Sequence, residues 1–98
     1  MGNGLKSANF LMESRLRDAG RGDANAFFDL GVLYSTGTGG VALDLIAAHK
    51  WFNLAAVSGM AAAAEARADV AEDMTAREVA EAQRQARAWL GATRRLAA

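Results

Sequence analysis

The chain has 98 residues, a length typical of one domain with a modest core. Eleven Lys and Arg balance eleven Asp and Glu, so no overall field would recruit nucleic acid or an anionic membrane. Cysteine is absent and there is one histidine, which excludes disulfides, thiolate metal sites and a two-histidine metal site within one chain. Much of the 52% hydrophobic content is alanine and proline is absent, so the composition favours helices.

The first predicted element is an introductory helix over residues 5–19. Either Asn3 or Ser7 is available as its N-terminal cap, and Gly20 is expected to follow its end. Its apolar residues recur at helical spacing: Leu5, Ala8, Met12, Leu16 and Ala19.

A second helix is predicted from Asp23, as N-cap, to about Ser35. Its buried face consists of Ala26, Leu30, Leu33 and Tyr34. Gly31 is expected to let another backbone come close, because it has no side chain. Three glycines then supply the left-handed conformations of a turn: Gly37, Gly39 and Gly40.

A third helix is predicted from Asp44, its N-cap, to Gly59, which stops it. One face of this helix carries Ala47, Ala48, Trp51, Leu54, Ala55 and Ser58. Trp51 and Tyr34 are the large side chains expected to fill the space between closely packed helices.

The last part of the chain predicts two more helices. The fourth is the alanine-rich run from about Met60 to Glu72. The fifth begins with a capping box formed by Thr75 and Glu78. Its predicted buried stripe is Val79, Ala82, Ala86, Trp89 or Leu90, and Thr93.

The chain repeats itself at a spacing of about 38 residues, which suits a two-helix unit. Residues 48–52 match residues 86–90, and residues 22–26 match residues 59–63. We therefore predict an all-α fold: an antiparallel helix-hairpin (α/α) repeat of about five helices, forming a short right-handed solenoid. Residues 1–21 would be an introductory helix, 22–59 a well-formed repeat, and 60–98 a degenerate repeat or cap.

Residues 22–63 resemble the Sel-one-like repeat, a relative of the tetratricopeptide repeat. The anchors that carry the resemblance are Ala26, Leu30, Gly31, Tyr34, Gly37, Gly39, Val41, Asp44, Ala48, Trp51, Ala55, Ala56, Gly59 and Ala63. Two features depart from the family pattern. The turn has one extra residue near Gly40, and the second unit keeps Trp89 but lacks the Leu-Gly-Tyr and Gly-x-Gly anchors.

The resemblance implies an adaptor, scaffold or regulatory protein that binds other proteins and is not an enzyme. We accordingly expect a non-catalytic module without cofactor or metal, whose partner is another protein or a second copy of the chain. Since solenoids with fewer than about three units are marginal alone, a dimer or a partner-dependent chain is expected. We also expect a cytoplasmic protein, because no apolar run suits a signal peptide or a membrane span. Arginine outnumbers lysine and alanine is abundant, which is typical of GC-rich bacterial genomes.

The candidate partner-binding residues lie on faces of the second and third helices that the main stripes leave free: Phe28, Asp29, Val32, His49, Phe52 and Asn53. Two interpretations are open for them. In one, the introductory helix covers Phe28 and Val32, and the fourth helix covers Phe52. In the other, these side chains form an exposed groove for a partner helix or peptide.

Two other function classes are also considered. A small helical enzyme or ligand-binding protein would need converging polar groups, and the sequence contains few candidates for them. A binder of anionic partners would use the arginines of the last helix, which are Arg84, Arg87, Arg94 and Arg95.

Overall fold

A computed structural model describes the backbone of residues 3–97 and the side chains of residues 10–94. Five α-helices and one short 3-10 helix make up this part of the chain, which contains no strand. They are α1 (Asn3–Gly20), α2 (Ala24–Thr36), η1 (Thr38–Gly40), α3 (Leu45–Val57), α4 (Ala61–Ala71) and α5 (Ala76–Ala97). The predicted all-α fold is confirmed.

Helices α2, α3 and α5 begin where their capping side chains predicted. The Asp23 carboxylate accepts a hydrogen bond from the Asn25 backbone N–H, and the Asp44 carboxylate accepts one from the Ala47 N–H. At α5 the capping box forms in both directions. The Thr75 N–H donates to Glu78 Oε1 at 2.8 Å, and the Glu78 N–H donates to Thr75 Oγ1 at 3.1 Å. These bonds satisfy N–H groups that have no partner within their helices.

The turn between α2 and α3 is built from left-handed glycines, as predicted. Gly37 and Gly39 both have φ of 66°, and Gly40 has φ of 81°. The Gly37 N–H closes α2 by donating to the Leu33 carbonyl oxygen. The Asp44 N–H then donates to the Tyr34 carbonyl oxygen at 3.0 Å, which ties the start of α3 to the end of α2. The hairpin is therefore fixed by backbone bonds as well as by packing.

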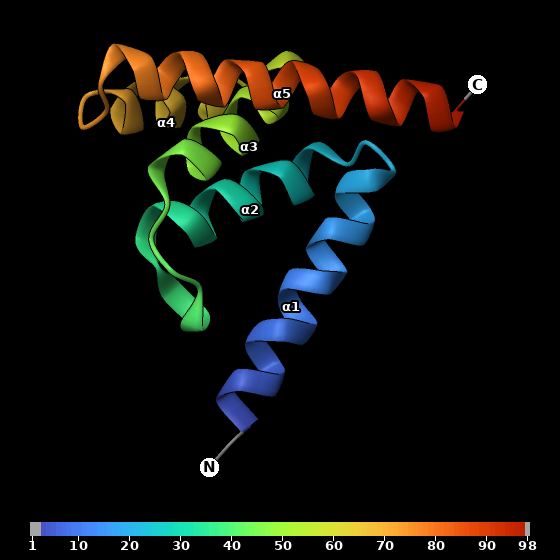
Figure 1. Ribbon diagram of the computed structural model, residues 1–98. Coiled ribbons are helices and arrows are strands. Elements are labelled where there is room, and N and C mark those ends of the chain that lie inside the picture. The colour runs from blue at the N-terminus through green and yellow to red at the C-terminus, as the bar shows by residue number, and fades with distance from the viewer. Residues whose placement is uncertain (1–2, 98) are drawn as a thin grey trace.

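Helix α3 is the centre of the fold, because it packs against α2, α4 and α5 (Figure 1). Its Trp51 is buried between two aromatic rings. The Phe27 ring stacks on it at a centroid distance of 6.0 Å, and the Trp89 ring meets it edge-on at 4.9 Å. Small buried residues let the helices approach closely: Ala26, Ala48, Ala55, Ala63, Ala82 and Ala86.

Helix α1 lies differently from the others. Its C-terminal half contacts α2, while its N-terminal end extends away from the remaining helices (Figure 1). Met12 and Leu11 pack against the core from this helix, and Ala19 is buried. The Tyr34 hydroxyl lies 4.0 Å from the Met12 sulfur, so this half-buried phenol joins α2 to α1. The predicted residues Leu5 and Ala8 have side chains outside the described residues.

Three local predictions need correction. Gly31 does not meet a backbone; a Cβ built on it would overlap the ring of Phe52. Gly20 is the last residue of α1, and the left-handed residue after that helix is Gly22, with φ of 82°. Ser58 is exposed at the end of α3, where its hydroxyl donates to the Leu54 carbonyl oxygen instead of packing in the core.

Candidate interaction surface

Two of the predicted partner-binding residues lie in a depression between α1 and α2. Its volume is about 220 Å³. Its lining consists of Leu11, Arg15, Asp29, Val32 and Leu33. We call these five residues the α1–α2 groove. The apolar side chains come from both helices, and 37% of Val32 is exposed. Helix α1 thus covers this face only in part. The outcome is intermediate between the two interpretations of the sequence, which were cover by the introductory helix and an exposed groove.

The predicted residue Asp29 forms an ion pair across the groove. Its Oδ2 lies 2.9 Å from Nε of Arg15, and both side chains are partly exposed. A pair of this kind contributes about 1 kcal/mol or less to stability. Its larger effect is on position, because it fixes the two charges beside the accessible apolar side chain of Val32. Sequence analysis missed Arg15 and Leu11, since nothing in the chain indicates how α1 crosses α2.

The structure removes Phe52 from the predicted accessible surface. Its side chain is 2% exposed and lies against Gly31 of α2. Phe28 packs on it, with ring centroids 5.4 Å apart. These two rings form an aromatic contact inside the α2–α3 hairpin, so Phe28 is half-buried and serves the core. The missing side chain of Gly31 is what makes room for this contact.

His49 is also buried, with 3% of its surface exposed, so it does not belong to an open binding surface. Its Nδ1 has no hydrogen-bond partner among the described residues. Burial lowers the pKa of the imidazole from its usual value, and the positive charge of Arg67 lowers it further. Both effects disfavour the charged form of the imidazole in the folded chain.

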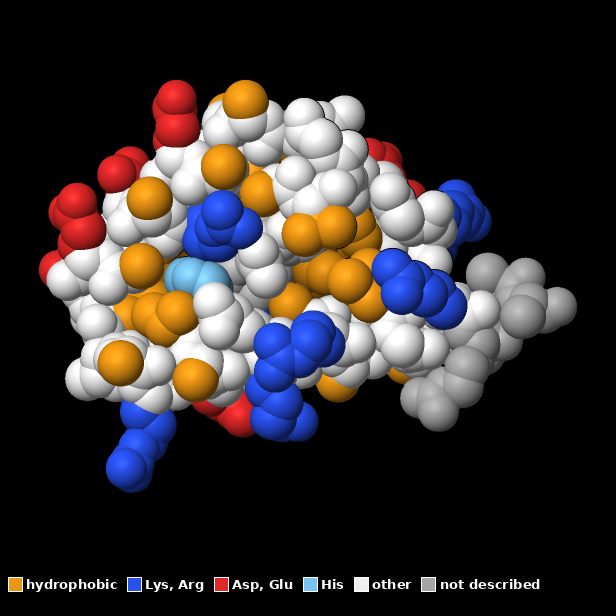
Figure 2. All heavy atoms as spheres, turned by 90° about the horizontal axis from the view of Figure 1, so that it is seen from above, with side chains coloured by type: hydrophobic (Ala, Val, Ile, Leu, Met, Phe, Trp, Pro, Cys, Tyr) orange, Lys and Arg blue, Asp and Glu red, His pale blue; other side chains and the backbone are white. Residues whose placement is uncertain are grey.

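The predicted residue Asn53 is bound to α4. Its Oδ1 accepts a hydrogen bond of 2.6 Å from Nη1 of Arg67. Figure 2 shows the molecule from above, where hydrophobic side chains gather around the pale-blue histidine. Asn53 and His49 thus join α3 to α4, and they lie apart from the α1–α2 groove.

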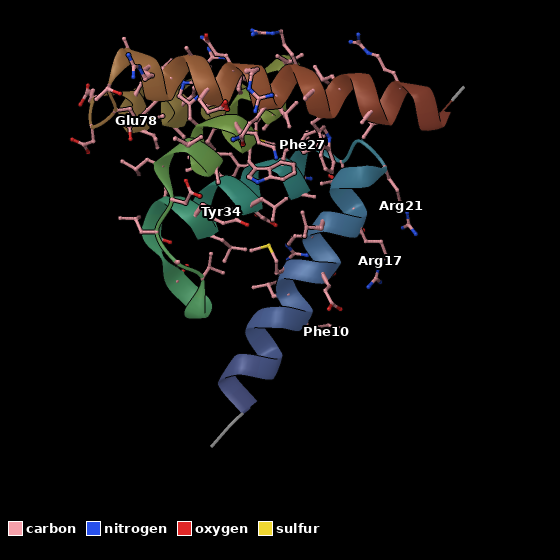
Figure 3. All side chains as sticks on the ribbon, in the orientation of Figure 1. Phe10, Arg17, Arg21, Phe27, Tyr34 and Glu78 are labelled. Atoms are coloured by element: carbon pink, nitrogen blue, oxygen red, sulfur yellow. The ribbon has the colours of Figure 1, made fainter. Side chains whose placement is uncertain are left out.

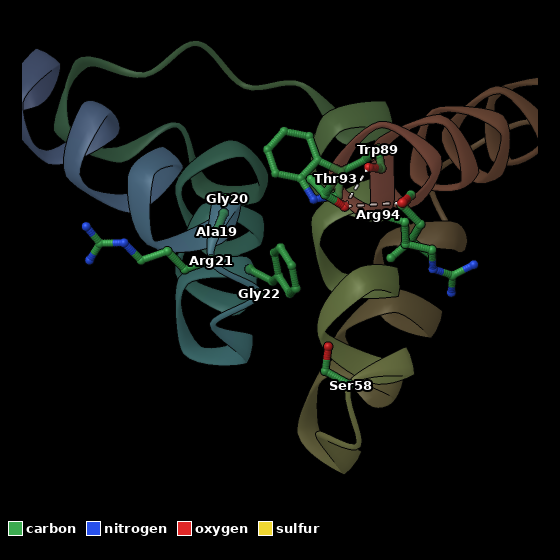
Figure 4. A pocket seen from close by; sticks show the side chains of 10 residues that line it. Ala19, Gly20, Arg21, Gly22, Ser58, Trp89, Thr93 and Arg94 are labelled. Atoms are coloured by element: carbon green, nitrogen blue, oxygen red, sulfur yellow. Dashed lines mark hydrogen bonds between the residues drawn. The ribbon is translucent and has the colours of Figure 1, made fainter. Parts of the chain in front are cut away.

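A second depression, of 270 Å³, was not predicted (Figure 4). It brings together the turn between α1 and α2, the end of α3 and the last turns of α5. Its lining residues are Ala19, Gly20, Arg21, Gly22, Phe27, Ser58, Trp89, Leu90, Thr93 and Arg94. These residues are far apart in the sequence, and no local pattern links them.

The polar groups of the second depression are not aimed at a ligand. The Thr93 hydroxyl donates to carbonyl oxygens of its own helix, at Trp89 and Leu90. Figure 4 shows the side chains of Arg21 and Arg94 pointing away from the depression on opposite sides. What remains inside is mainly apolar surface from Trp89 and its neighbours, without converging hydrogen-bond donors.

Lys50 is the cation closest to the aromatic core. Its Nζ lies 4.5 Å from the Trp51 ring centroid and 5.6 Å from that of Trp89, which is within cation–π range. Burial lowers the pKa of this ammonium group, while the nearby Asp44 carboxylate raises it. Lys50 thus stabilises the contact between α3 and α5.

The arginines of the last helix are partly neutralised. Arg84 forms hydrogen bonds of 2.7 to 3.0 Å with both carboxylate oxygens of Glu81, one turn away. This pairing raises the pKa of Arg84 and lowers that of Glu81. Arg87 and Arg94 are exposed. The side chain of Arg95 is outside the described residues.

No group of three or more His, Asp or Glu side chains is placed to hold a metal ion in the described part of the chain. Among the helices of residues 3–97, none is both long and apolar enough to cross a bilayer. Comparison of the sequence and structure with protein-family models, curated proteins and solved structures gave no match.

Proposed function

We propose that this chain is a non-catalytic interaction module, built on a Sel-one-like helical repeat, that binds an amphipathic helix of another protein in the α1–α2 groove. The observation that carries the proposal is the groove itself. It keeps apolar side chains of two helices accessible beside the charged pair of Arg15 and Asp29. An apolar centre with polar groups at its rim is the usual composition of a protein interface.

The packing of the α2–α3 hairpin supports the repeat interpretation. The anchor residues Ala26, Leu30, Ala48, Trp51 and Ala55 are all buried in the core. The turn anchors Gly37 and Gly39 are left-handed, and Gly59, which ends α3, has φ of 102°. Such residues give the hairpin its shape.

The position of α1 supports binding at this groove. The N-terminal end of α1 extends away from α2 (Figure 1), and Val32 in the groove is 37% exposed. A partner helix lying there would bury the exposed part of Val32 and would keep the charges of Arg15 and Asp29 at its edge. The charged pair would orient the partner, because each charge attracts the opposite charge on it.

The test compares Val32→Asp with Val57→Asp. Both changes place a carboxylate on an exposed valine, but Val57 is 65% exposed at the end of α3 and lies outside the groove. Phe28 is unsuitable for this test because it packs on Phe52. Both variants are first checked for helix content by circular dichroism. A partner captured with the wild type is then identified, purified and titrated.

We expect Val32→Asp to weaken binding of the purified partner by about tenfold or more, because the aspartate would be buried against apolar surface. Val57→Asp should bind like the wild type. Equal affinity of all three proteins for the partner would reject the groove as the binding surface.

A further inference from the structure

The side of α1 that faces away from α2 carries an unusual combination of side chains. We call Phe10, Glu13, Arg17 and Gly20 the outer face of α1. All four residues are exposed, and 71% of Phe10 is accessible, the largest value among the exposed large hydrophobic residues described. Figure 3 shows Phe10 and Arg17 along the edge of α1 that is turned away from α2.

The residues of the outer face are spaced like the a and d positions of a heptad, although Phe10 is the one large apolar side chain among them. They are separated by three, four and three positions, which are the separations of the positions that meet in a two-helix coiled coil. In this spacing, Phe10 and Arg17 are at one kind of position, a, and Glu13 and Gly20 are at the other, d. When two such helices run antiparallel, a residue at position a of one helix lies opposite a residue at position d of the other. Phe10 then lies opposite Gly20 of the other copy, and Glu13 lies opposite Arg17. The face is therefore complementary to itself, as a two-fold interface requires.

The geometry of each residue suits this pairing. A Cβ built on Gly20 meets no atom within 4 Å, and this glycine, at the end of the helix, also lines the second depression, so the surface beside it is open to the Phe10 ring of a second copy. Neither Glu13 nor Arg17 forms an ion pair with any residue of the described part of the chain. Among side chains 10–94, both charges are therefore available to a partner. Leu16, which is 37% exposed, borders the same face and would add apolar contact.

We infer that α1 pairs with α1 of a second copy of this chain, antiparallel and about a two-fold axis, through the outer face of α1. Two reciprocal ion pairs between Glu13 and Arg17 set the register, and two Phe10 rings provide the apolar contact. The dimer is weak, because the apolar area of this face is small compared with that of an obligate interface. The outer face lies on the other side of α1 from the α1–α2 groove, so either interaction can occur without the other.

The test is a charge exchange in the 98-residue chain. Sedimentation equilibrium is measured over a range of concentrations for the wild type, Glu13→Arg, Arg17→Glu and the double variant. Each single change places like charges opposite each other in the dimer, whereas the double change restores opposite charges with their positions exchanged. Asp69→Arg, an exposed site on α4, is the matched control for the change in net charge.

We expect the wild type to dimerise reversibly, and each single variant to dimerise about tenfold more weakly. The double variant should recover most of the wild-type affinity, and Asp69→Arg should leave it unchanged. A wild type that remains monomeric at all concentrations would overturn the inference. A dimer that the single variants do not weaken, or that the double variant does not restore, would overturn it equally.

The dimer test is separate from the test of the proposed function. It needs only the isolated chain, whereas the groove is tested with a purified partner. Val32→Asp is included in the sedimentation series for this reason. If Val32→Asp weakened the dimer and Glu13→Arg did not, the two copies would contact each other through the α1–α2 groove. That result would reject the outer face of α1 as the dimer interface.

Discussion

The ring of Phe52 lies in the space that a side chain at position 31 would occupy. A Cβ built on Gly31 would overlap three atoms of that ring. Both residues are buried, so the Phe52 ring cannot turn toward solvent to relieve the overlap. The close approach of α2 and α3 therefore depends on the glycine, and the depth at which Phe52 is buried depends on it as well.

Gly31→Ala is expected to destabilise the protein. The added methyl group forces Phe52 to move, and overpacking of this kind costs about 1–3 kcal/mol, only partly offset by the higher helix propensity of alanine. The free energy of unfolding from urea denaturation measures the effect.

Gly91→Ala is the matched control for this prediction. Gly91 also lies within a helix, but a Cβ there meets no atom within 4 Å. This change should stabilise the protein by about 0.5–1 kcal/mol, the usual difference in helix propensity. If both changes stabilised the chain equally, Phe52 would not be confined by Gly31.

Trp51→Ala should remove the centre of the core. Trp51 contacts Phe27 and Trp89, which come from α2 and α5, so its removal leaves a cavity where three helices meet. The expected loss is about 3–5 kcal/mol, a large part of the stability of a domain of this size. Thermal and urea unfolding monitored by circular dichroism provide the measurement.

The variant Trp89→Ala distinguishes the central tryptophan from the peripheral one. Trp89 is only partly buried, so its loss should cost less than the loss of Trp51. Equal losses for the two variants would contradict the central position of Trp51.

Stability is expected to fall as the pH decreases below the usual pKa of histidine. The folded chain lowers the pKa of His49 below 6.5, so the unfolded chain takes up a proton first as the pH falls. The free energy of unfolding should therefore be constant above about pH 7 and decrease toward about pH 5.5, by at most about 1.4 kcal/mol per pH unit. Urea denaturation across this range gives the profile.

His49→Gln should remove this part of the pH profile, because glutamine does not titrate. The second cause of the lowered pKa, the charge of Arg67, is tested with Arg67→Met. That variant should show a weaker decrease than the wild type. A wild-type profile that matches His49→Gln between these pH values would show that His49 is not held neutral by burial.

Sequence alone determined the five helices and the capped starts of three of them. The capping residues Asp23, Asp44 and Thr75 act within one turn of their own position, so their effect does not depend on the rest of the fold. The left-handed turn glycines are also local, because only the missing Cβ permits their conformation at low cost. Helical periodicity predicted the burial of Trp51. Apolar residues at helical spacing mark the face of a helix that packs inward, and this holds for any position of the helix in the fold.

Only the tertiary structure decided which side chains remain accessible. Periodicity placed Phe28, Val32, His49 and Phe52 off the main stripes, but each of α2 and α3 has neighbours on more than one side. The angle at which α1 crosses α2 leaves Val32 partly open, while Gly31 admits Phe52 into the core. These outcomes depend on contacts between residues far apart in the chain, and local spacing carries no information about them. The accessible surface, and with it the site for a partner, is therefore a property of helix packing.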